Sequence, residues 1–407
     1  MADVATARPP FWRDVRVIRV AAQVGTLIAA GLLLRWLFDN LATNIDEQGI
    51  PSPFDIDEWR ALANKPAGFA VRDSSFDPES PLWKLILVGI QNTAAVAVVG
   101  ITFALTLGTL IGVGRLSSNW VVRKVSTLYV ETFRNIPVLV IIIFFWQSLF
   151  TFGPFPLFNP TNPPGTIQVP GSDSNLLIYS KSRWGFPSIA NEANGGTFWI
   201  VMLVGVVVAA IVWRWRTTVN ERTGAPHRRV LWSIGALVII AVVAFIALGG
   251  PIRWSFPAVG ETGRTIVGGI ATNDAYIALT LALGIYTASH IAEIVRGSIL
   301  AVPKGQNEAA NALALTGFQR YRFVVLPQAF RIAIPPIINQ FLNLVKNSSL
   351  AIAVAYPEIT ALVKTAIGNG NPATQLIAVL MACYLLFSLF ISLVLNIVNR
   401  RLQLAGR

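Results

Sequence analysis

Long apolar stretches recur along the chain and constrain its fold more than any other feature. About eight of them reach the roughly 20 residues that a helix needs to cross a lipid bilayer. Because the stretches are long and uninterrupted, they predict helices rather than the short alternating strands of a β-barrel. The sequence therefore predicts an all-α fold, a polytopic membrane helical bundle with about eight transmembrane helices, near Val17–Phe38, Leu85–Val113, Val125–Phe150, Thr197–Trp213, Val230–Gly249, Asp274–Val295, Ile332–Tyr356 and Thr374–Val398.

The composition agrees with a membrane protein and disfavours an enzyme. Only 13% of the 407 residues are charged, whereas soluble domains average about 25%. The single cysteine, Cys383, excludes an internal disulfide and a zinc site built on thiolates. The chain also lacks a phosphate-binding glycine loop with its lysine, and it lacks the H-E-x-x-H metal motif. We therefore predict no catalytic residues, no metal site and no cofactor on this chain.

The positive charge is distributed as the positive-inside rule describes. The net charge is +12, and about 20 of the 32 Lys and Arg residues fall on the side that holds the N-terminus, whereas most acidic residues fall on the other side. This distribution predicts that the N and C termini are both cytoplasmic. Because the basic residues are spread over several short segments, they do not predict a nucleic-acid site. We expect the first apolar stretch to be an uncleaved anchor rather than a signal peptide.

The longest predicted cytoplasmic segment lies near Arg296–Phe330, and its residues 302–329 are predicted to form two short helices outside the membrane. Asn307 is expected to cap the first helix, with Glu308 in its first turn, where the helix dipole favours a carboxylate. Thr316 is expected to cap the second helix, which Leu326-Pro327 would end. An alanine-rich helix of this kind can dock in a groove of another protein. Alternatively, the segment can lie on the lipid headgroups as an amphipathic loop.

The spacing within this segment resembles the signature loop of ABC transporter permeases: Glu-Ala-Ala, three residues, Gly, nine residues, Ile, any residue, Leu-Pro. Glu308-Ala309-Ala310 and Leu326-Pro327 stand at the matching distance, and Val324 takes the isoleucine place. Ala314 takes the glycine place, a departure that predicts a shift of the bend between the helices to Thr316-Gly317. The resemblance implies an ATPase-coupling loop made by Glu308, Ala309, Ala310, Ala314, Thr316, Gly317, Leu326 and Pro327.

Further blocks resemble the polar amino-acid uptake (His/Gln-type) branch of these permeases, and above all its long general L-amino-acid members. The blocks are Tyr129–Arg134, Ala292–Gly297, Val302–Gln306 and Leu326–Ala329. The resemblance implies an N-terminal extra helix and periplasmic loop, a first part of the permease core, an insert with a periplasmic loop and two extra helices, and a second part of the core. These parts are expected at 1–82, 83–150, 151–272 and 273–407.

The resemblance also implies partners and a location. It implies an amino-acid importer in the bacterial inner (plasma) membrane, with ATP-binding-cassette ATPase subunits that hydrolyse the ATP. It further implies a second permease subunit, homologous or identical, and a periplasmic solute-binding protein. The alternative is a stand-alone secondary transporter or channel for small polar solutes, which is expected to show internal repeats. The amino acids carried, the permease pairing and the role of the insert stay open at this point.

Polar residues inside the predicted helices are candidates for a substrate path, because such residues usually face a cavity or a partner helix. Asn339, Asn343 and Lys346 fall on one stripe of a helix. Hydrogen bonding between helices would explain this stripe nearly as well. Glu131 and Arg134 are spaced for an ion pair that braces the bundle. The candidates for the path are Asn339, Asn343, Lys346, Ser348, Ser349, Glu131, Arg134 and Asn92.

Overall fold

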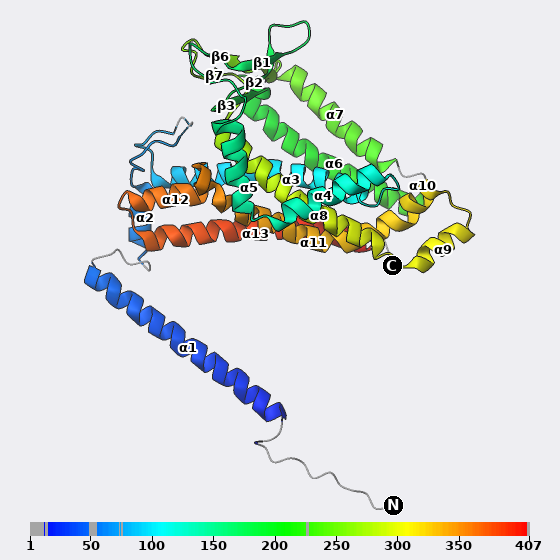
Figure 1. Cartoon of the computed structure of the whole chain (residues 1–407), viewed down its shortest axis with the longest axis horizontal. Coiled ribbons are helices and arrows are strands. Elements are labelled where there is room, and N and C mark those ends of the chain that lie inside the picture. The colour runs from blue at the N-terminus through cyan, green and yellow to red at the C-terminus, as the bar shows by residue number, and fades with distance from the viewer. Residues whose placement is uncertain are drawn as a thin grey trace, which may run out of the picture. The chain divides into compact units, whose positions relative to one another are not determined.

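The computed structural model describes residue 12 and residues 15–48, 55–72, 74, 76–224 and 228–404. The chain is mainly helical (Figure 1). Six described helices are long and apolar enough to cross a membrane, or up to eight if each of two bent helix pairs counts as one span. The polytopic helical class is therefore confirmed, whereas the number of spans and the side of each terminus stay predictions. The chain divides into two compact units, 1–90 with 359–386 and 91–358 with 387–407.

The first unit contains a small packed core and one long exposed helix. Leu85, Ile359 and Val363 are fully buried in this core, and the hydroxyls of Thr360 and Tyr384 lie 3.0 Å apart at its edge. None of the apolar window of the long helix is buried, as expected for a span that faces lipid. The elements of this unit are α1 (Val15–Gln48), α2 (Ile56–Asn64), the first turns of α3 (Leu82–Gly114), α12 (Ile359–Gly368) and the first half of α13 (Ala373–Leu404).

The second unit holds the remaining helices. Its helix α8 (Asp274–Leu300) is the most buried of its elements, and α4, α5 and α11 all pack against it. The other elements are the rest of α3, α4 (Trp120–Asn135), α5 (Val138–Phe145), the π-helix η2 (Trp146–Thr151), α6 (Gly195–Thr223), α7 (Arg229–Ala247), α9 (Lys304–Ala312), α10 (Gly317–Arg320), the π-helix η3 (Tyr321–Val325), α11 (Leu326–Asn347), the 3₁₀ turn η4 (Ser348–Val354) and the end of α13.

Glycines allow α3 to approach α8 closely. A Cβ atom added to Gly108 would lie 2.8 Å from the carbonyl oxygen of Ala288, and one added to Gly112 would lie 2.7 Å from that of Ala292. No side chain fits at such distances, so these two positions require glycine. Small residues at one-turn spacing are the usual means of close helix packing in membranes. This contact holds α3 beside the core of α8, where Ile291 is fully buried.

The third predicted span, Val125–Phe150, is not one straight helix. α4 ends at Asn135, α5 begins at Val138, and the two helical segments meet at 105°. The cause is Pro137, because a proline disfavours helical backbone in the preceding residue. Ile136 is accordingly extended, with φ −95° and ψ 132°. The single helix predicted here is therefore wrong in shape, although both halves are helical.

Three small antiparallel sheets lie in segments that the sequence predicts as loops, so the all-α prediction is incomplete. The four-stranded sheet has the order β1-β2-β3-β8, and Trp184 in it pairs with Thr272. Strands this short leave no alternating pattern long enough to detect. The strands are β1 (Gly165–Gln168), β2 (Asn175–Tyr179), β3 (Arg183–Phe186), β4 (Ser188–Asn191), β5 (Ile252–Ser255), β6 (Ala258–Val259), β7 (Ile266–Val267) and β8 (Ile270–Asn273).

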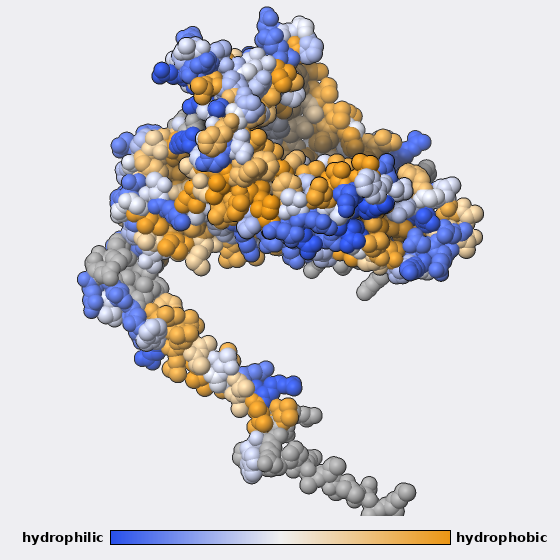
Figure 2. All heavy atoms as spheres, viewed as in Figure 1, coloured by the Kyte–Doolittle hydropathy of each residue, from blue (hydrophilic) through white to orange (hydrophobic). Residues whose placement is uncertain are grey.

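The surface of the second unit separates apolar helices from polar ends. Hydrophobic residues cover much of the helical face in view, whereas hydrophilic residues gather at the tip of the strand region, around α9 and in a band across the lower middle of the helices (Figure 2). Large apolar side chains such as Leu203, Ile239 and Ile246 are more than half exposed. In water such exposure would be a liability, so these faces indicate contact with lipid or with other helices.

Candidate functional site

The predicted coupling segment begins with α9, which leaves the end of α8 after a short turn. α9 starts at Lys304 with Pro303 at its N-cap, so the prediction that Asn307 caps it is wrong. The reason is that Pro303 is already in the extended conformation of an N-cap, and the helix forms directly behind it. Glu308 and Ala309 are exposed on α9, whereas Ala310 is only 2% exposed.

The bend after α9 lies at Ala314, and the prediction that it shifts to Thr316-Gly317 is wrong. Ala314 has φ 54°, in the left-handed region that favours glycine, and Gly317 lies in α10 with no such backbone. The amide of Ala314 donates to the carbonyl of Asn311 at 2.9 Å, and that of Leu315 donates to the carbonyl of Ala310 at 3.1 Å. These two bonds form a Schellman motif, in which the left-handed residue is usually glycine. The hydrogen bonds hold the bend where the resemblance places glycine, despite the alanine.

Thr316 caps α10, as predicted. Its hydroxyl accepts from the amide of Gln319, and the Gln319 side chain accepts from the amide of Thr316 at 2.9 Å, which completes a capping box. The helix does not end at Leu326-Pro327, contrary to the prediction. The π-helix η3 precedes the proline, and the amide of Leu326 donates to the carbonyl of Tyr321. The wider π turn accommodates the missing proline amide, and the helical path runs on into α11.

Side-chain contacts tie α9 to the helix that follows it. Arg320 donates to the side-chain oxygen of Asn311 at 3.0 Å, and Gln328 donates to that of Gln306 at 3.2 Å. Beneath these bonds, a small apolar cluster joins both ends of the segment through Val302, Val325 and Ala329. The α9–α10 segment is therefore a folded projection fixed to α8 and α11.

An apolar surface on this projection faces outward. Leu313 is 75% exposed, Phe318 is 72% exposed, and Phe323 is 63% exposed. We use the name α9–α10 surface for these three exposed side chains together with the exposed Ala309 and Glu308. The guanidinium of Arg322 lies 6.0 Å from the ring centre of Phe318 and 5.6 Å from that of Phe323. Sequence reasoning selected the alanines but missed these larger side chains. The hydrophobic residues beside the bend were the available signal, because a Schellman motif often places an apolar residue there.

The predicted polar stripe lies on an uncovered face of α11. Asn339, Asn343 and Lys346 are all exposed, whereas their neighbours Phe341 and Leu344 are buried. The stripe is therefore turned away from the packed side of its own unit. This arrangement leaves its amides and its ammonium group open to a cavity or to another subunit.

Other predicted path residues already have partners within the second unit. The Asn92 amide donates to the carbonyl of Pro357 at 2.7 Å. The hydroxyls of Ser348 and Ser349 donate to carbonyls of their own helical segment, at 2.7 and 2.8 Å. Glu131 and Arg134 are both exposed on α4, and within the described ranges no ion pair joins them, so the predicted pairing is wrong. Asn339, Asn343 and Lys346 thus share an exposed face of α11, and Ser349 is hydrogen-bonded to the main chain of Lys346 beside them.

An ionic cluster that sequence reasoning did not select joins α3 to α8. The Glu293 carboxylate accepts hydrogen bonds from Arg115, which follows α3, and from Arg296 at 2.6 Å. The side chains of these residues are between 13% and 31% exposed. Glu293 and Arg296 stand in a block already noted for its resemblance, but the spacing alone gives no reason to pair them with Arg115. Among the described residues, no group of three His, Cys, Asp or Glu is placed to hold a metal ion.

Comparison with known proteins identifies a family. Residues 100–404 match the family described as binding-protein-dependent transport system inner membrane component. The putative amino-acid ABC transporter permease protein YhdX of Escherichia coli is 37% identical over 95% of this chain and 94% of its own length. The general L-amino acid transport system permease protein AapQ of Rhizobium johnstonii is 36% identical over 97% of this chain and 94% of its own length.

A third relative matches the chain over most of its length, and one solved structure shows a weaker likeness. The glutamate/glutamine/aspartate/asparagine transport system permease protein BztB of Rhodobacter capsulatus is 33% identical over 96% of this chain and 95% of its own length. A crystal structure of an amino acid ABC transporter with histidines matches 79% of this chain and 95% of that chain, at 18% identity and a TM-score of 0.46.

Proposed function

The chain belongs to the family of binding-protein-dependent transport system inner membrane components, and we propose that it converts ATP hydrolysis on a separate subunit into amino-acid passage between its helices. It is the permease subunit of an amino-acid ABC transporter, as the extent of the match to full-length relatives shows. Its role is transport and not catalysis.

The α9–α10 surface receives the force. The observation that carries this proposal is the fixed projection itself, on which Leu313, Phe318 and Phe323 are each more than half exposed. Exposed apolar side chains rimmed by polar ones are typical of a protein interface. The exposed Glu308 carboxylate of the same surface offers a partner for a cationic residue of the ATPase. Because α9 is hydrogen-bonded to α11, movement of an ATPase docked on this surface displaces α11.

The stripe of Asn339, Asn343 and Lys346 lines the substrate path. Its exposure on α11 supports this proposal, because an uncovered amide inside a bilayer needs water, substrate or a partner helix. Amide and ammonium groups can bind the carboxylate of an amino acid, and the amide oxygens can accept from its amino group. A second permease subunit, identical or homologous, closes the other side of the path. A periplasmic solute-binding protein delivers the substrate.

The chain crosses the inner membrane of a bacterium about eight times. Its N and C termini both lie in the cytoplasm. The charge distribution supports this orientation, because Arg115, Arg296 and the arginines in the last turns of α6 then all lie on the cytoplasmic side. The strands of the predicted insert, 151–272, then lie on the periplasmic side. The α9–α10 surface lies in the cytoplasm, where an ATPase can reach it.

Co-purification and uptake measured together test the function. The tagged chain is expressed with its native neighbouring genes, purified in mild detergent and reconstituted into liposomes. We expect an ATP-binding-cassette subunit to co-purify, and we expect uptake of radiolabelled amino acids that requires ATP on the ATPase side. ATP-independent uptake by the purified chain alone would support the stand-alone transporter instead. A panel of acidic, amide and aliphatic amino acids identifies the substrate class.

A further inference from the structure

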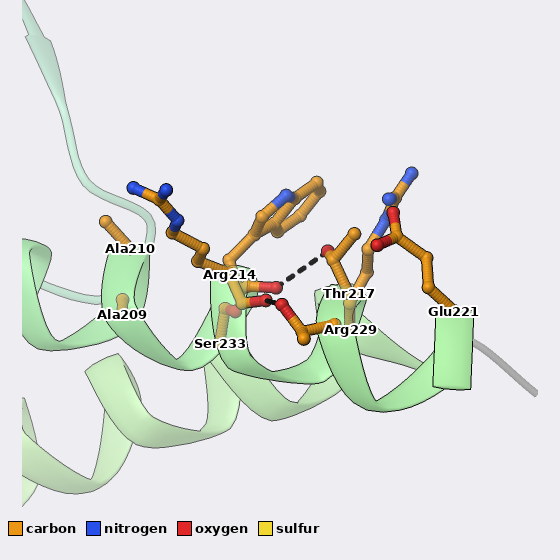
Figure 3. Close-up of a pocket in the computed structure, with 9 residues that line it drawn as sticks. Ala209, Ala210, Arg214, Thr217, Glu221, Arg229 and Ser233 are labelled. Carbon is orange, nitrogen blue, oxygen red and sulfur yellow. Dashed lines mark hydrogen bonds between the residues drawn. The ribbon is translucent and has the colours of Figure 1, made fainter. Parts of the chain in front are cut away.

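The α6–α7 hairpin carries a cationic cavity at one end that the transport function does not use. α6 is apolar through Val212, and its last turns then carry Arg214, Arg216 and Arg222. The returning helix α7 begins at Arg229. A cavity of about 1160 Å³ opens between the two helices here, and Arg214, Glu221, Arg229 and Ser233 line it (Figure 3). The cavity therefore lies where the hydropathy of both helices places the boundary between the bilayer and water.

Indole rings hold the arginines at this boundary. The Arg229 guanidinium lies 4.9 Å from the ring centre of Trp213, and that of Arg216 lies 5.2 Å from Trp232. Tryptophans are enriched at the level of the lipid headgroups because the ring is amphipathic. Cation–π contact leaves the hydrogen-bond donors at the guanidinium edge free for another ligand. Within the described part of the chain, neither Arg214 nor Arg229 forms an ion pair.

A buried hydroxyl also lines the cavity without a partner. Ser233 is 7% exposed, and its Oγ atom makes no hydrogen bond in the structure. A buried hydroxyl without a partner costs free energy, so its presence in the cavity wall points to a ligand that bonds to it. The neighbouring hydroxyls of Thr217 and Thr218 donate to the carbonyls of Trp213 and Arg214 and are not available in the same way. Of the three hydroxyl groups that line the cavity, only that of Ser233 lacks a hydrogen-bond acceptor within the described protein.

We propose that this cavity binds the headgroup of an anionic glycerophospholipid. Arg214 and Arg229, whose guanidinium groups extend to opposite sides of the cavity (Figure 3), attract the phosphodiester from two sides, and Ser233 lies between them in the wall. The glycerol backbone lies toward the small side chains of Ala209 and Ala210 further into the span. Arginine is suited to this task because its planar fork matches phosphate geometry. The apolar end of the cavity favours a lipid over a soluble anion, because only a lipid has an apolar body continuous with its charged group. Basic pockets between membrane helices bind anionic headgroups in this manner.

Lipid titration of the full chain tests the proposal. Purified protein is titrated with dioleoylphosphatidylglycerol or dioleoylphosphatidylcholine, and bound lipid is counted by native mass spectrometry. We expect preferential binding of phosphatidylglycerol. Arg214→Gln and Arg229→Gln should each weaken it about fivefold, which corresponds to the loss of about 1 kcal/mol per arginine near a membrane surface. Ser233→Ala should weaken it as well, although it changes no charge.

The matched control is Arg222→Gln, which removes the same charge from the same helix outside the cavity. Its phosphatidylglycerol affinity should equal that of the wild type. Equal losses for Arg222→Gln and Arg214→Gln would overturn the proposal, because they would indicate attraction by the surface as a whole. Displacement of the lipid by millimolar inorganic phosphate would also overturn it and would assign the cavity to a soluble anion. A normal thermal unfolding midpoint for each variant ensures that the comparison concerns binding.

Discussion

The guanidinium of Arg115 donates a hydrogen bond to the carboxylate of Glu293, and this bond connects the residue after α3 to the last turns of α8. The two residues are 178 positions apart in the chain. The bond stands at the same end of α8 from which the α9–α10 segment projects. The Arg115–Glu293 bond therefore ties the end of α8, from which the α9–α10 segment projects, to α3, which is not part of that segment. Arg296 completes the cluster from one turn further along α8.

The first prediction concerns this cluster. Glu293→Gln should lower the free energy of unfolding by about 1–3 kcal/mol, because it leaves the mostly buried Arg115 without its charged partner. The thermal unfolding midpoint in detergent measures the effect, and a double-mutant cycle with Arg115→Gln isolates the pair. The control is Arg60→Gln, whose ion pair with Asp57 is exposed and should matter little. A cycle with no coupling between Arg115 and Glu293 would contradict the structure at this point.

The second prediction concerns Ala314. Ala314→Gly should stabilise the α9–α10 segment by about 1 kcal/mol, because glycine removes the steric cost of the left-handed backbone. Hydrogen exchange of the α9 amides reports the local stability. Ala312→Gly is the matched control with the opposite sign, since glycine inside a helix destabilises it by about 1 kcal/mol. Slower exchange in the wild type than in Ala314→Gly would show that the bend is not strained.

The third prediction concerns coupling. Ala309→Asp places a carboxylate on the α9–α10 surface and should weaken ATPase docking by several kcal/mol, on the order of the cost of burying an unpaired charge. The permease itself should insert and stay folded, because α9 lies outside the spans. Co-purification and amino-acid uptake measure the effect. Asn307→Asp adds the same charge on another face of α9 and should leave both ATPase co-purification and amino-acid uptake unchanged. Normal uptake in Ala309→Asp would refute the coupling role of the α9–α10 surface.

The fourth prediction concerns the polar stripe. Asn343→Leu keeps a similar volume but removes the amide, so uptake should fall while expression and complex assembly stay unchanged. Asn343→Gln retains an amide and should preserve part of the uptake. Transport assays in proteoliposomes, with the ATPase rate measured in parallel, separate passage from coupling. Wild-type uptake and ATPase rate in a well-expressed Asn343→Leu protein would assign the stripe to packing between helices.

The fifth prediction concerns topology. Reporter fusions after Trp59, Gly171 and Thr262 should report the periplasm, because these positions lie on the side poorer in basic residues. Fusions after Asn119, Glu221 and Gly305 should report the cytoplasm. A single clear reversal among the latter three would break the arrangement of about eight spans with both ends inside.

The helices of the membrane-spanning part could be predicted because hydrophobic length is a strong signal. Leu85–Val113 and Asp274–Val295 fall within α3 and α8 as the structure has them. Pro137 could have indicated the bend, because a proline disfavours helical backbone in the residue before it. The continuous apolar stretch around it led instead to the prediction of one straight helix. The strands carried no usable signal, since β6 and β7 have two residues each. Pairing of segments as distant as β3 and β8 is a tertiary effect that a local pattern does not contain.

The candidate site was predictable to a different degree in each part. Thr316 followed from capping chemistry, and Asn339 and Asn343 followed from helical periodicity, because both rules are local. The place of the bend did not follow, because the hydrogen bonds of the Schellman motif outweigh the preference of Ala314. The Arg115–Glu293 contact did not follow either, since it depends on how α3 packs on α8. Local rules were thus right for the Thr316 cap and wrong for the Asn307 cap and for the bend, whereas the long-range contact had no local signal at all.

The uninterrupted helical path from α10 through η3 into α11 makes this segment a lever. Phe318 at one end and Asn343 near the other are separated by about 35–40 Å at the usual helical rise. A rigid rod of that length turns a small tilt at the docked end into a shift of several ångströms at the far end. The helix is expected to bend most easily at two places. One is the wider π turn of η3, and the other is the Pro335–Pro336 pair inside α11, where two main-chain N–H donors are missing. If an ATPase docks on the α9–α10 surface as proposed, the displacement that reaches Asn343 depends on how far the helix bends at these two places.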